Sequence, residues 1–453
     1  MLRRRPILLG SAAALSLLAA GCGNQYRPVV SAINPVGPAT QPTKYAIAIS
    51  SPSTTAPGLL TFVDFAGDTV LSTPQILANP IYLALAAGGS QGYVINSAGS
   101  FNEFPAGSPE SLISSQIGQS TLSAGSPPVS ISSFTMPGTN ASVFVPEPGL
   151  SQVAALTSTG SLDQNIGVPN NPIYVVGTSG ARRAYVISQG DGATPSTVSS
   201  VENGNLAVSS TIPVGINPVY GVITGDGNRA FILNKGSGTV NVINVINNGP
   251  DLAMPVIPAT GTLGLHPVWA DLSPLTNQLM VLNQGDGTHP GSLSIINIPL
   301  CNAASPASNP TCNPANPVDA VGFGTVLATV PVGINPVMVS VLQDGTKAYV
   351  ANAGNAAAGV EGSVSVVNLV SGQVSATIPG VSTASATADT NTTPGSVYGH
   401  PTTIVATTGT PTGKVYVTSS DNKFMTVIET DTDTVVTHVN LQGLGVRVVI
   451  TSP

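Results

Sequence analysis

The seven-residue segment PVGINPV occurs twice without a change, at Pro213–Val219 and at Pro331–Val337. Each copy opens a stretch in which strand-like runs alternate with turns. Weaker copies of the same entry point recur along the chain, at Asn79-Pro80, Pro127-Pro128, Asn171-Pro172, Asn217-Pro218, His266-Pro267, Asn335-Pro336 and His400-Pro401. Recurrence of one structural cue over most of a sequence indicates a repeat protein.

Each repeat contains runs in which apolar and small side chains alternate, a pattern typical of β-strands. Thirteen to fifteen residues after most of the entry prolines, an aromatic or large apolar residue opens a second run. These runs are Tyr93–Asn96, Tyr185–Ser188, Phe231–Asn234, Met280–Asn283, Tyr349–Asn352 and Tyr416–Ser419. Third runs follow, as at Thr239–Asn244, Ser292–Asn297 and Ser363–Asn368. Turn dipeptides such as Asp226-Gly227 between the runs predict antiparallel hairpins.

The spacing of the entry prolines predicts the architecture. It is 44 to 49 residues from Pro80 to Pro267, and the next two steps, of 69 and 65 residues, contain inserts. Four short antiparallel strands at this spacing predict an all-β fold, a single β-propeller of four-stranded antiparallel blades. Because 42% of the residues are apolar and 7% are charged, we expect the chain to fold.

Two second runs and their surroundings resemble a known repeat. KAYVAN at Lys347–Asn352 and KVYVTS at Lys414–Ser419, with an entry proline before them and a third run such as SVSVVN, resemble the YVTN-family β-propeller repeat. The resemblance covers nearly all of the segment from Tyr45 to Pro453. It implies a propeller, usually of seven blades, in a family that includes many cell-envelope proteins and lies close to propeller lactonases.

The two ends of the repeat region predict how the ring closes. Before the first entry proline, Tyr45–Ser50, Leu59–Phe65 and Thr69–Leu71 supply three strands, and Val446–Thr451 supplies one inner-type strand at the other end. Joined in one blade, they remove the open sheet edge that invites aggregation. Seven entry-point blades and this composite blade make eight. Seven remains the alternative if the weak unit Pro128–Val168 is not a full blade.

The N-terminus has the features of a targeting segment. A basic run, Arg3 to Arg5, precedes an apolar stretch from Ile7 to Ala20 that is short for a membrane span. The small residues before Cys22 resemble a lipobox, which implies a lipoprotein signal peptide over residues 1–21 and lipidation of Cys22. The alternative is an ordinary secretory signal cut nearby. Residues 22–43 are expected to form a flexible tether, and residues 44–453 the propeller domain.

If Cys22 carries lipid, two cysteines remain, Cys301 and Cys312, in a loop rich in proline and asparagine. We expect them to form a disulfide in an oxidising compartment. A metal site is the competing interpretation, but two thiols without a nearby histidine or third cysteine make a poor zinc set.

Propeller geometry predicts a site at one mouth of the channel. The connections from fourth to first strands and from second to third strands share one face, which places a ring of side chains before the entry prolines. The predicted ligand-binding residues are Asn79, Asn171, Asn217, His266, Asn335 and His400, with Asp191 and Asp286 from two QGDG loops. The insert Val381–Gly399 belongs to the same face as a candidate lid that brings Tyr398 close to the mouth. His438 is expected on the solvated outer surface.

Four interpretations of this ring stay open at the level of sequence. Asparagine and histidine before proline serve as turn formers in an architectural role. Converging imidazoles of His266, His400 and His289 suit a transition metal, although blade geometry separates the first two. A lactonase-like reaction needs a general base, His266 or His400, with Asp191 or Asp286 within reach. The fourth interpretation is a binding site without catalysis. No catalytic residue, resident metal or cofactor is predicted.

These observations favour a non-catalytic, membrane-anchored module of the bacterial cell envelope that binds a small ligand or an envelope protein. The alternative is a lactonase-like hydrolase at the polar channel mouth, so enzymatic activity stays open. A net charge of −7 with 13 basic residues argues against nucleic-acid binding. We expect a monomer that faces the periplasm or the cell surface; a self-associating surface-layer component is the other possibility. The sequence leaves the ligand and the choice of membrane open.

Overall fold

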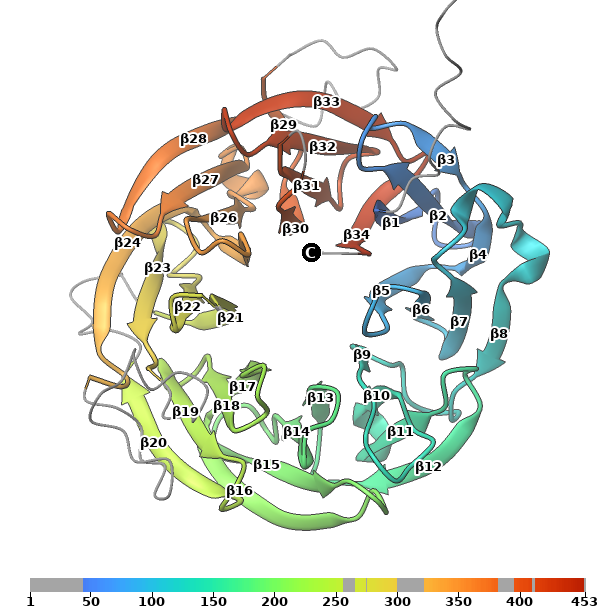
Figure 1. Cartoon of the computed structure of the whole chain (residues 1–453), viewed down its shortest axis with the longest axis vertical. Coiled ribbons are helices and arrows are strands. Elements are labelled where there is room, and N and C mark those ends of the chain that lie inside the picture. Colours follow the sequence, from blue (N-terminus) through green and yellow to red (C-terminus); the bar gives the residue numbers. More distant parts are fainter. Residues whose placement is uncertain are drawn as a thin grey trace, which may run out of the picture. The chain divides into compact units, whose positions relative to one another are not determined.

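The described part of the chain is a closed ring of β-sheets. The computed structural model describes residues 44–255, 265–273, 275–299, 322–381, 395–409 and 412–451. The chain divides into two compact units, Met1–Pro42 and Thr43–Pro453, and all described residues belong to the second. They form eight antiparallel blades arranged as a β-propeller (Figure 1), which confirms the predicted fold and blade count. No helix among them is long and apolar enough to cross a membrane.

Blades 1 to 4 follow one another around the ring, and the strands of each run from the innermost to the outermost. Blade 1 contains β34 (Leu444–Ile450), β1 (Tyr45–Ser51), β2 (Pro57–Asp64) and β3 (Val70–Ser72), and β4 (Gln75–Ala78) also pairs with β2. Blade 2 contains β5 (Pro80–Leu85), β6 (Gln91–Asn96), β7 (Ser100–Pro105) and β8 (Gly118–Thr121). Blade 3 contains β9 (Ser132–Ser133), β10 (Val143–Glu147), β11 (Gln152–Leu156) and β12 (Leu162–Gly167). Blade 4 contains β13 (Pro172–Val176), β14 (Arg183–Ser188), β15 (Pro195–Glu202) and β16 (Val208–Ile216).

Blades 5 to 8 complete the ring in the same order. Blade 5 contains β17 (Pro218–Ile223), β18 (Arg229–Asn234), β19 (Thr239–Asn244) and β20 (Gly249–Pro255). Blade 6 contains β21 (Pro267–Ser273), β22 (Gln278–Asn283), β23 (Pro290–Asn297) and β24 (Val326–Ile334). Blade 7 contains β25 (Pro336–Val341), β26 (Lys347–Asn352), β27 (Ser363–Asn368) and β28 (Gln373–Val381), which pairs in parallel with β29 (Val397–Tyr398). Blade 8 contains β30 (Pro401–Thr407), β31 (Lys414–Ser419), β32 (Phe424–Glu429) and β33 (Thr434–Asn440). Short 3-10 turns lie at Pro109–Ser111, Ser114–Gln116, Pro148–Leu150 and Ala356–Ala358.

The C-terminal strand closes the ring as predicted. β34 pairs antiparallel with β1, with Ala46 opposite Ile450 and Ala48 opposite Val448. The Thr451 backbone N–H donates to the Tyr45 carbonyl at 3.0 Å, which extends the pairing by one residue. The inner strand of blade 1 therefore comes from one end of the repeat region and its other strands come from the opposite end.

The weak unit is a full blade with a shortened inner strand. β9 is two residues long, but β10, β11 and β12 pair with the usual register. Ser130 and Ser132 each donate from Oγ to a carbonyl of the next inner strand, Ile173 and Val175, at 2.7 Å. Side-chain hydrogen bonds to blade 4 thus supplement the sparse strand pairing of blade 3, and the count of eight holds.

The second strands form the centre of each blade because both of their faces are buried. Their opening tyrosines, Tyr93, Tyr185, Tyr349 and Tyr416, are at most 1% exposed. At their other ends lie buried asparagines whose amides reach the third strand. Asn234 Nδ2 donates to Asn241 Oδ1 at 2.8 Å, and Asn352 Nδ2 donates to Ser365 Oγ at 3.0 Å. A buried amide is stable only when it is hydrogen-bonded, so these residues fix the register between second and third strands.

Charged side chains tie neighbouring blades together at their outer turns. Lys414 of blade 8 donates from Nζ to Asp68 Oδ2 and to the Phe65 carbonyl of blade 1, both at 2.6 Å. Lys347 of blade 7 pairs in the same way with Asp433 of blade 8 at 2.9 Å.

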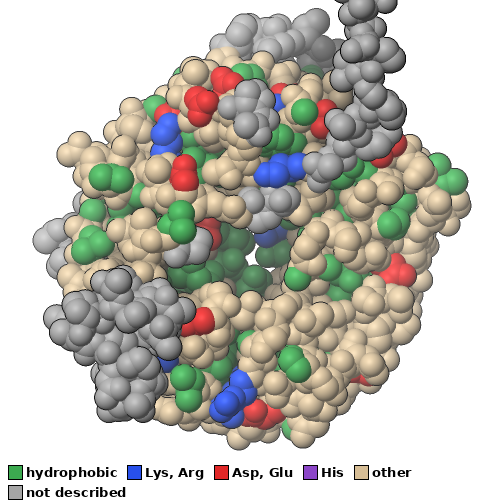
Figure 2. Space-filling model, viewed as in Figure 1, with side chains coloured by type: hydrophobic (Ala, Val, Ile, Leu, Met, Phe, Trp, Pro, Cys, Tyr) green, Lys and Arg blue, Asp and Glu red, His purple; other side chains and the backbone are tan. Residues whose placement is uncertain are grey.

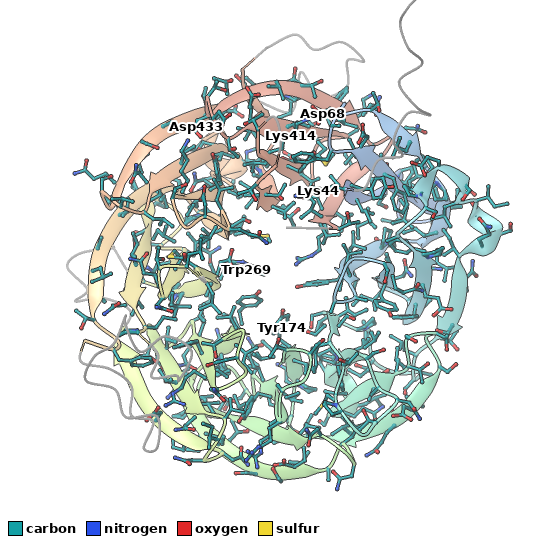
Figure 3. The ribbon with its side chains drawn as sticks, in the orientation of Figure 1. Lys44, Asp68, Tyr174, Trp269, Lys414 and Asp433 are labelled. Atoms are coloured by element: carbon teal, nitrogen blue, oxygen red, sulfur yellow. The ribbon has the colours of Figure 1, made fainter. Side chains whose placement is uncertain are left out.

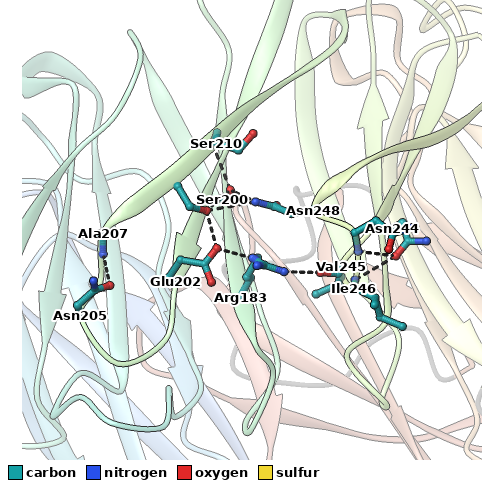
Figure 4. A network of polar contacts seen from close by, with 12 residues as sticks. Arg183, Ser200, Glu202, Asn205, Ala207, Ser210, Asn244, Val245, Ile246 and Asn248 are labelled. Carbon is teal, nitrogen blue, oxygen red and sulfur yellow. Dashed lines mark hydrogen bonds and ion pairs between the residues drawn. The ribbon is translucent and has the colours of Figure 1, made fainter.

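A third contact of this kind joins blades 4 and 5. Arg183 pairs with Glu202 and donates to the Val245 carbonyl at 2.6 Å (Figure 4). Nearby, Asn248 Nδ2 donates to Ser200 Oγ at 3.0 Å across the same boundary. The chain has few charged side chains, and several of them make these contacts between blades.

The pair of Lys414 and Asp68 lies beside the closing blade, so its loss should weaken the whole ring. Their side chains are 10% and 15% exposed, and burial raises the pKa of Asp68 although the Lys414 ammonium opposes that rise. Lys414→Met keeps the apolar stem and leaves the Asp68 carboxylate without its cation. We expect the free energy of unfolding to fall by about 2–4 kcal/mol in urea titrations. Arg182→Met, at an exposed position, should change it by less than about 0.5 kcal/mol; equal effects would contradict the assignment.

Candidate functional site

The residues before the entry prolines adopt a backbone conformation that few side chains tolerate. Asn79, Asn171, Asn217, His266 and Asn335 have φ angles between 51° and 60°, in the left-handed region that asparagine visits most readily. Each of their carbonyls accepts a hydrogen bond from the residue that follows the second strand of the same blade. These contacts give the five residues a local role as turn formers.

The eighth blade begins differently. Gly399 takes the left-handed conformation there, with φ of 73°, and His400 follows it. The His400 backbone N–H donates to Asp421 Oδ1 at 2.9 Å, and its Nδ1 lies 2.6 Å from Asp421 Oδ2. No other hydrogen bond of the His400 ring is present among the described residues, which leaves Nε2 without a partner there.

Side chains of this ring also connect neighbouring blades. Gln189 accepts from Asn171 Nδ2 at 3.2 Å and donates to Asn217 Oδ1 at 2.5 Å. Gln284 accepts from Lys235 Nζ at 2.7 Å and donates to Asn335 Oδ1 at 2.6 Å. The glutamines lie in the loops after β14 and β22. Gln189 joins the entry turn of its own blade 4 to that of blade 5, and Gln284 joins blades 5 and 7 to its own blade 6. Most of the amide groups of the ring are therefore already bonded within the protein.

A cavity of about 560 Å³ opens among the entry turns and second-to-third strand loops of blades 5 to 8. We call it the entry-face cavity. Its polar lining consists of Lys235, His266, Gln284, Asp286, Asn335, Asn355 and His400. It brings together four of the eight predicted ligand-binding residues, His266, Asp286, Asn335 and His400. Asn79, Asn171, Asn217 and Asp191 do not line it.

The two QGDG aspartates stabilise their own loops. Asp191 Oδ1 accepts from the backbone N–H groups of Thr194 and Ala193 at 2.9 Å, and these bonds lower the pKa of its carboxyl. Asp286 accepts from the His289 backbone N–H at 2.8 Å and lies 2.7 Å from His289 Nδ1, which holds its pKa well below the usual range.

A lactonase-like reaction was predicted to pair His266 or His400 with Asp191 or Asp286. The structure does not form these pairs. His266 uses Nδ1 for a contact of 2.8 Å with the Gly285 carbonyl, and Asp286 bonds within its own loop. The carboxylate beside a cavity histidine is Asp421, next to His400, which sequence reasoning missed. The position of Asp421 just after a second strand, in a loop of the entry face, was the sequence feature that could have indicated it. In the described part of the chain, no three His, Cys, Asp or Glu side chains are grouped closely enough to hold a metal ion.

Two predictions about aromatic side chains were wrong. Tyr398 is 2% exposed and stacks on His438 at 3.8 Å, so it lies in the core beside β28 instead of at the channel mouth. His438 is covered by the same stack, and its Nε2–H donates to the Ser396 carbonyl at 2.8 Å. Its position in an outermost strand suggested exposure, but Tyr398 of β29 covers one face of its ring, so the side chain is half-buried.

Other predictions fall on residues that the structure does not describe. Cys22, Cys301 and Cys312 lie outside the described residues, as do residues 382–394 of the proposed lid. Both Cys301 and Cys312 stand in the sequence between β23 and β24, that is, between a third and a fourth strand.

One segment matches a hydrolase sequence motif but does not lie in the strand-turn-helix context that the motif requires. Gly88–Gly92 matches the pattern Gly-x-Ser-x-Gly, in which a strained turn between a strand and a helix presents a nucleophilic serine. Here the segment lies in the hairpin between β5 and β6, with no helix after it. The serine of this turn is therefore not presented as a nucleophile.

Comparison with known proteins supports the fold and goes no further. No protein-family model matches the chain, and no curated protein matches it. Among solved structures, it is similar to apo AztD from Citrobacter koseri, with a TM-score of 0.58, 11% identity, and coverage of 90% of this chain and 97% of that one. It is also similar to dihydro-heme d1 dehydrogenase NirN in complex with DHE, with a TM-score of 0.62, 11% identity, and coverage of 90% and 75%. Both are β-propellers.

His438 should make folding depend on pH. Burial lowers the pKa of His438, and its Nδ1 is buried without a partner among the described residues, so protonation would strand an N–H group. The unfolded chain then binds this proton more tightly, and stability should fall as pH drops below about 6.5. His438→Phe keeps the stack on Tyr398 and should lose less stability between about pH 7.5 and about pH 5 in urea titrations. Parallel losses in both proteins would refute this role.

Proposed function

We propose that the protein is a membrane-anchored β-propeller of the bacterial cell envelope that binds a polar ligand or a protein without converting it. The entry-face cavity carries the proposal. Its volume of about 560 Å³ lies within the range of small-molecule sites. Lys235, His266, Asp286, Asn355 and His400 offer both charges and several donors and acceptors, which suits a polar partner.

The cavity is fixed before a ligand arrives. Gln284 holds Lys235 and Asn335 through two hydrogen bonds, and Asn355 Nδ2 donates to the Gly287 carbonyl at 3.2 Å. A rigid lining lowers the entropy cost of binding. The structurally similar NirN is described in complex with DHE, so a propeller of this general shape is compatible with a bound small molecule.

A lactonase-like hydrolase is the alternative, and one observation favours it. His400 lines the cavity with Nδ1 held by Asp421 at 2.6 Å, the arrangement that orients an imidazole as a general base. No second catalytic group accompanies this pair among the described residues of the cavity. His266 contacts a backbone carbonyl, and Asp286 accepts hydrogen bonds within its own turn. A binding site needs no such second group, so binding without catalysis accounts for the geometry more simply.

The cellular setting is part of the proposal. The repeat motifs resemble those of YVTN-family envelope propellers, and the N-terminal pattern supports a signal peptide over residues 1–21, lipid on Cys22 and a tether over residues 22–43. A disulfide between Cys301 and Cys312 fits the same oxidising compartment. Expression of Cys22→Ala in a bacterial host should release the protein from the membrane fraction. Unchanged membrane association would refute the anchor.

The binding function predicts a saturable interaction that depends on the cavity. Purified protein captured on a surface should bind a component of solubilised bacterial envelope, and the double variant Lys235→Ala/His400→Ala should lose most of that response. Arg182→Ala, an exposed change outside the cavity, is the matched control and should bind like the wild type. Hydrolysis of a panel of lactones and esters should stay at background.

Two outcomes would overturn the proposal. Lactone hydrolysis that is lost in Asp421→Asn would establish the hydrolase. Absence of saturable binding, together with concentration-dependent self-association in size-exclusion chromatography, would indicate a structural surface component.

A further inference from the structure

The inner strands place one residue of each repeat at the same point along the channel. This residue is the second one after the entry proline. In the pairing of the inner strand with the second strand, the register shifts between the proline and this residue, as between Pro218 and Tyr220. Four of these residues are aromatic, namely Tyr82, Tyr174, Tyr220 and Trp269. In the closing strand the matching position, two after Gly445, is Arg447, opposite Ile49. We call these five residues the channel belt.

Four residues of the belt border a second cavity, separate from the entry-face cavity; the fifth, Trp269, stacks on Tyr220 and is not part of the lining. The volume of this cavity is about 390 Å³, and its lining includes Tyr82, Tyr174, Tyr220 and Arg447 with the inner strands of blades 1 to 6. The two cavities share no lining residue. The space-filling view shows the hollow along the axis with hydrophobic side chains on its wall (Figure 2). Tyr174 and Trp269 lie at the inner edge of the ring (Figure 3).

The aromatic rings of the belt are in mutual contact. Tyr220 and Trp269 stack with centroids 3.9 Å apart and planes at 16°, and Tyr174 contacts Tyr220 at 4.8 Å. The Arg447 guanidinium carbon lies 3.9 Å from the Tyr82 ring centroid and 5.6 Å from that of Trp269. The belt therefore combines a flat aromatic wall with one cation held against it.

Arg447 is half-buried, and its guanidinium lacks the ion-pair partner that a largely covered cation normally has. Its Nε is buried without a hydrogen-bond partner, and no carboxylate of the described residues lies within ion-pairing distance of it. Asp271 lines the same cavity but accepts from the Val341 and Leu272 backbone N–H groups, each at 2.8 Å. Removing Nε of Arg447 from water without a hydrogen-bond partner costs free energy, and the stacking of the guanidinium on Tyr82 offsets part of that cost.

The other polar groups of the belt are donors as well. Tyrosine hydroxyls keep their protons at physiological pH, and burial raises the pKa of Tyr82 and of Tyr220 further above the ordinary value. Because the site offers one guanidinium and several hydroxyls, it suits a single negative charge. Burial raises the pKa of Asp271 to about 6, and the backbone N–H groups of Val341 and Leu272 oppose that rise.

We propose that the channel belt binds a small aromatic carboxylate, with its carboxylate on the Arg447 guanidinium and its ring against the tyrosine side chains that line the cavity, one of which, Tyr220, stacks on Trp269. Paired N–H donors of arginine match the two oxygens of a carboxylate, which fixes the orientation of the ligand. The proposal is independent of the entry-face cavity and of the function proposed for it.

Calorimetric titration of the full-length protein with naphthalene-2-carboxylate tests the site. We expect saturable binding, and Arg447→Gln should weaken it by about tenfold or more because the charge partner is lost. Arg182→Gln, which removes an exposed arginine outside the belt, should bind like the wild type. The neutral analogue naphthalene-2-carboxamide should bind the wild-type protein about tenfold more weakly than the carboxylate.

A second measurement does not depend on the folding of a variant. The sequence contains one tryptophan, Trp269, so its fluorescence reports directly on the belt. Benzoate should change Trp269 emission in the wild-type protein with saturation, and benzamide should have a much smaller effect. Absence of saturable binding by both carboxylates, or equal binding of carboxylate and amide, would overturn the proposal, as would equal affinity of wild type and a folded Arg447→Gln protein.

Discussion

Pairing between β34 and β1 is the constraint on which the rest of the ring depends. A propeller has no single core; apolar side chains pack between successive blades, so each blade needs a neighbour on both sides. Blade 1 stands between blades 2 and 8 and lacks an inner strand until β34 joins it. In the apolar cluster at the closure, Ala48 of β1 and Val448 of β34 pack with Tyr416 of blade 8. Closure also contributes Arg447, the cation of the channel belt.

The left-handed residue that precedes five of the entry prolines has consequences at both ends of an inner strand. At the mouth it aims the carbonyl of Asn217 or His266 at the loop after the second strand and leaves the side chain on the entry face. Inside the channel, the register shift after the proline turns the second residue toward the axis. The entry turn and the register shift after its proline therefore position residues of both the entry-face cavity and the channel belt, although different residues line the two cavities.

Much of this arrangement was predictable because it is local and repeated. Period-two alternation gave the strands, and the lone strand at Val446–Thr451 gave the composite blade. The entry turns at Asn79 and His266 were readable from residue type, since asparagine and histidine tolerate positive φ better than most. The belt was readable too: an aromatic residue stands two places after Pro80, Pro172, Pro218 and Pro267.

Contacts between distant segments were not predictable in the same way. The bond between His400 and Asp421 depends on how the loop after β31 folds back onto the entry turn. The burial of Tyr398 and His438 depends on β29, a two-residue strand that runs parallel to its partner. The interpretation of Asp191 and Asp286 as partners of cavity histidines gave too little weight to local hydrogen bonding, which satisfies such carboxylates within their own turns.

The central claim is that the C-terminal strand is a full inner strand of the ring, which completes both the closure and the channel. Hydrogen exchange of the backbone amides, resolved by mass spectrometry, tests it most directly. Amides of β34 should be protected to the same extent as those of β1 and of inner strands such as β17, and should exchange only when the whole propeller opens. Rapid exchange of β34, comparable to that of exposed turns while the other inner strands stay protected, would contradict the account.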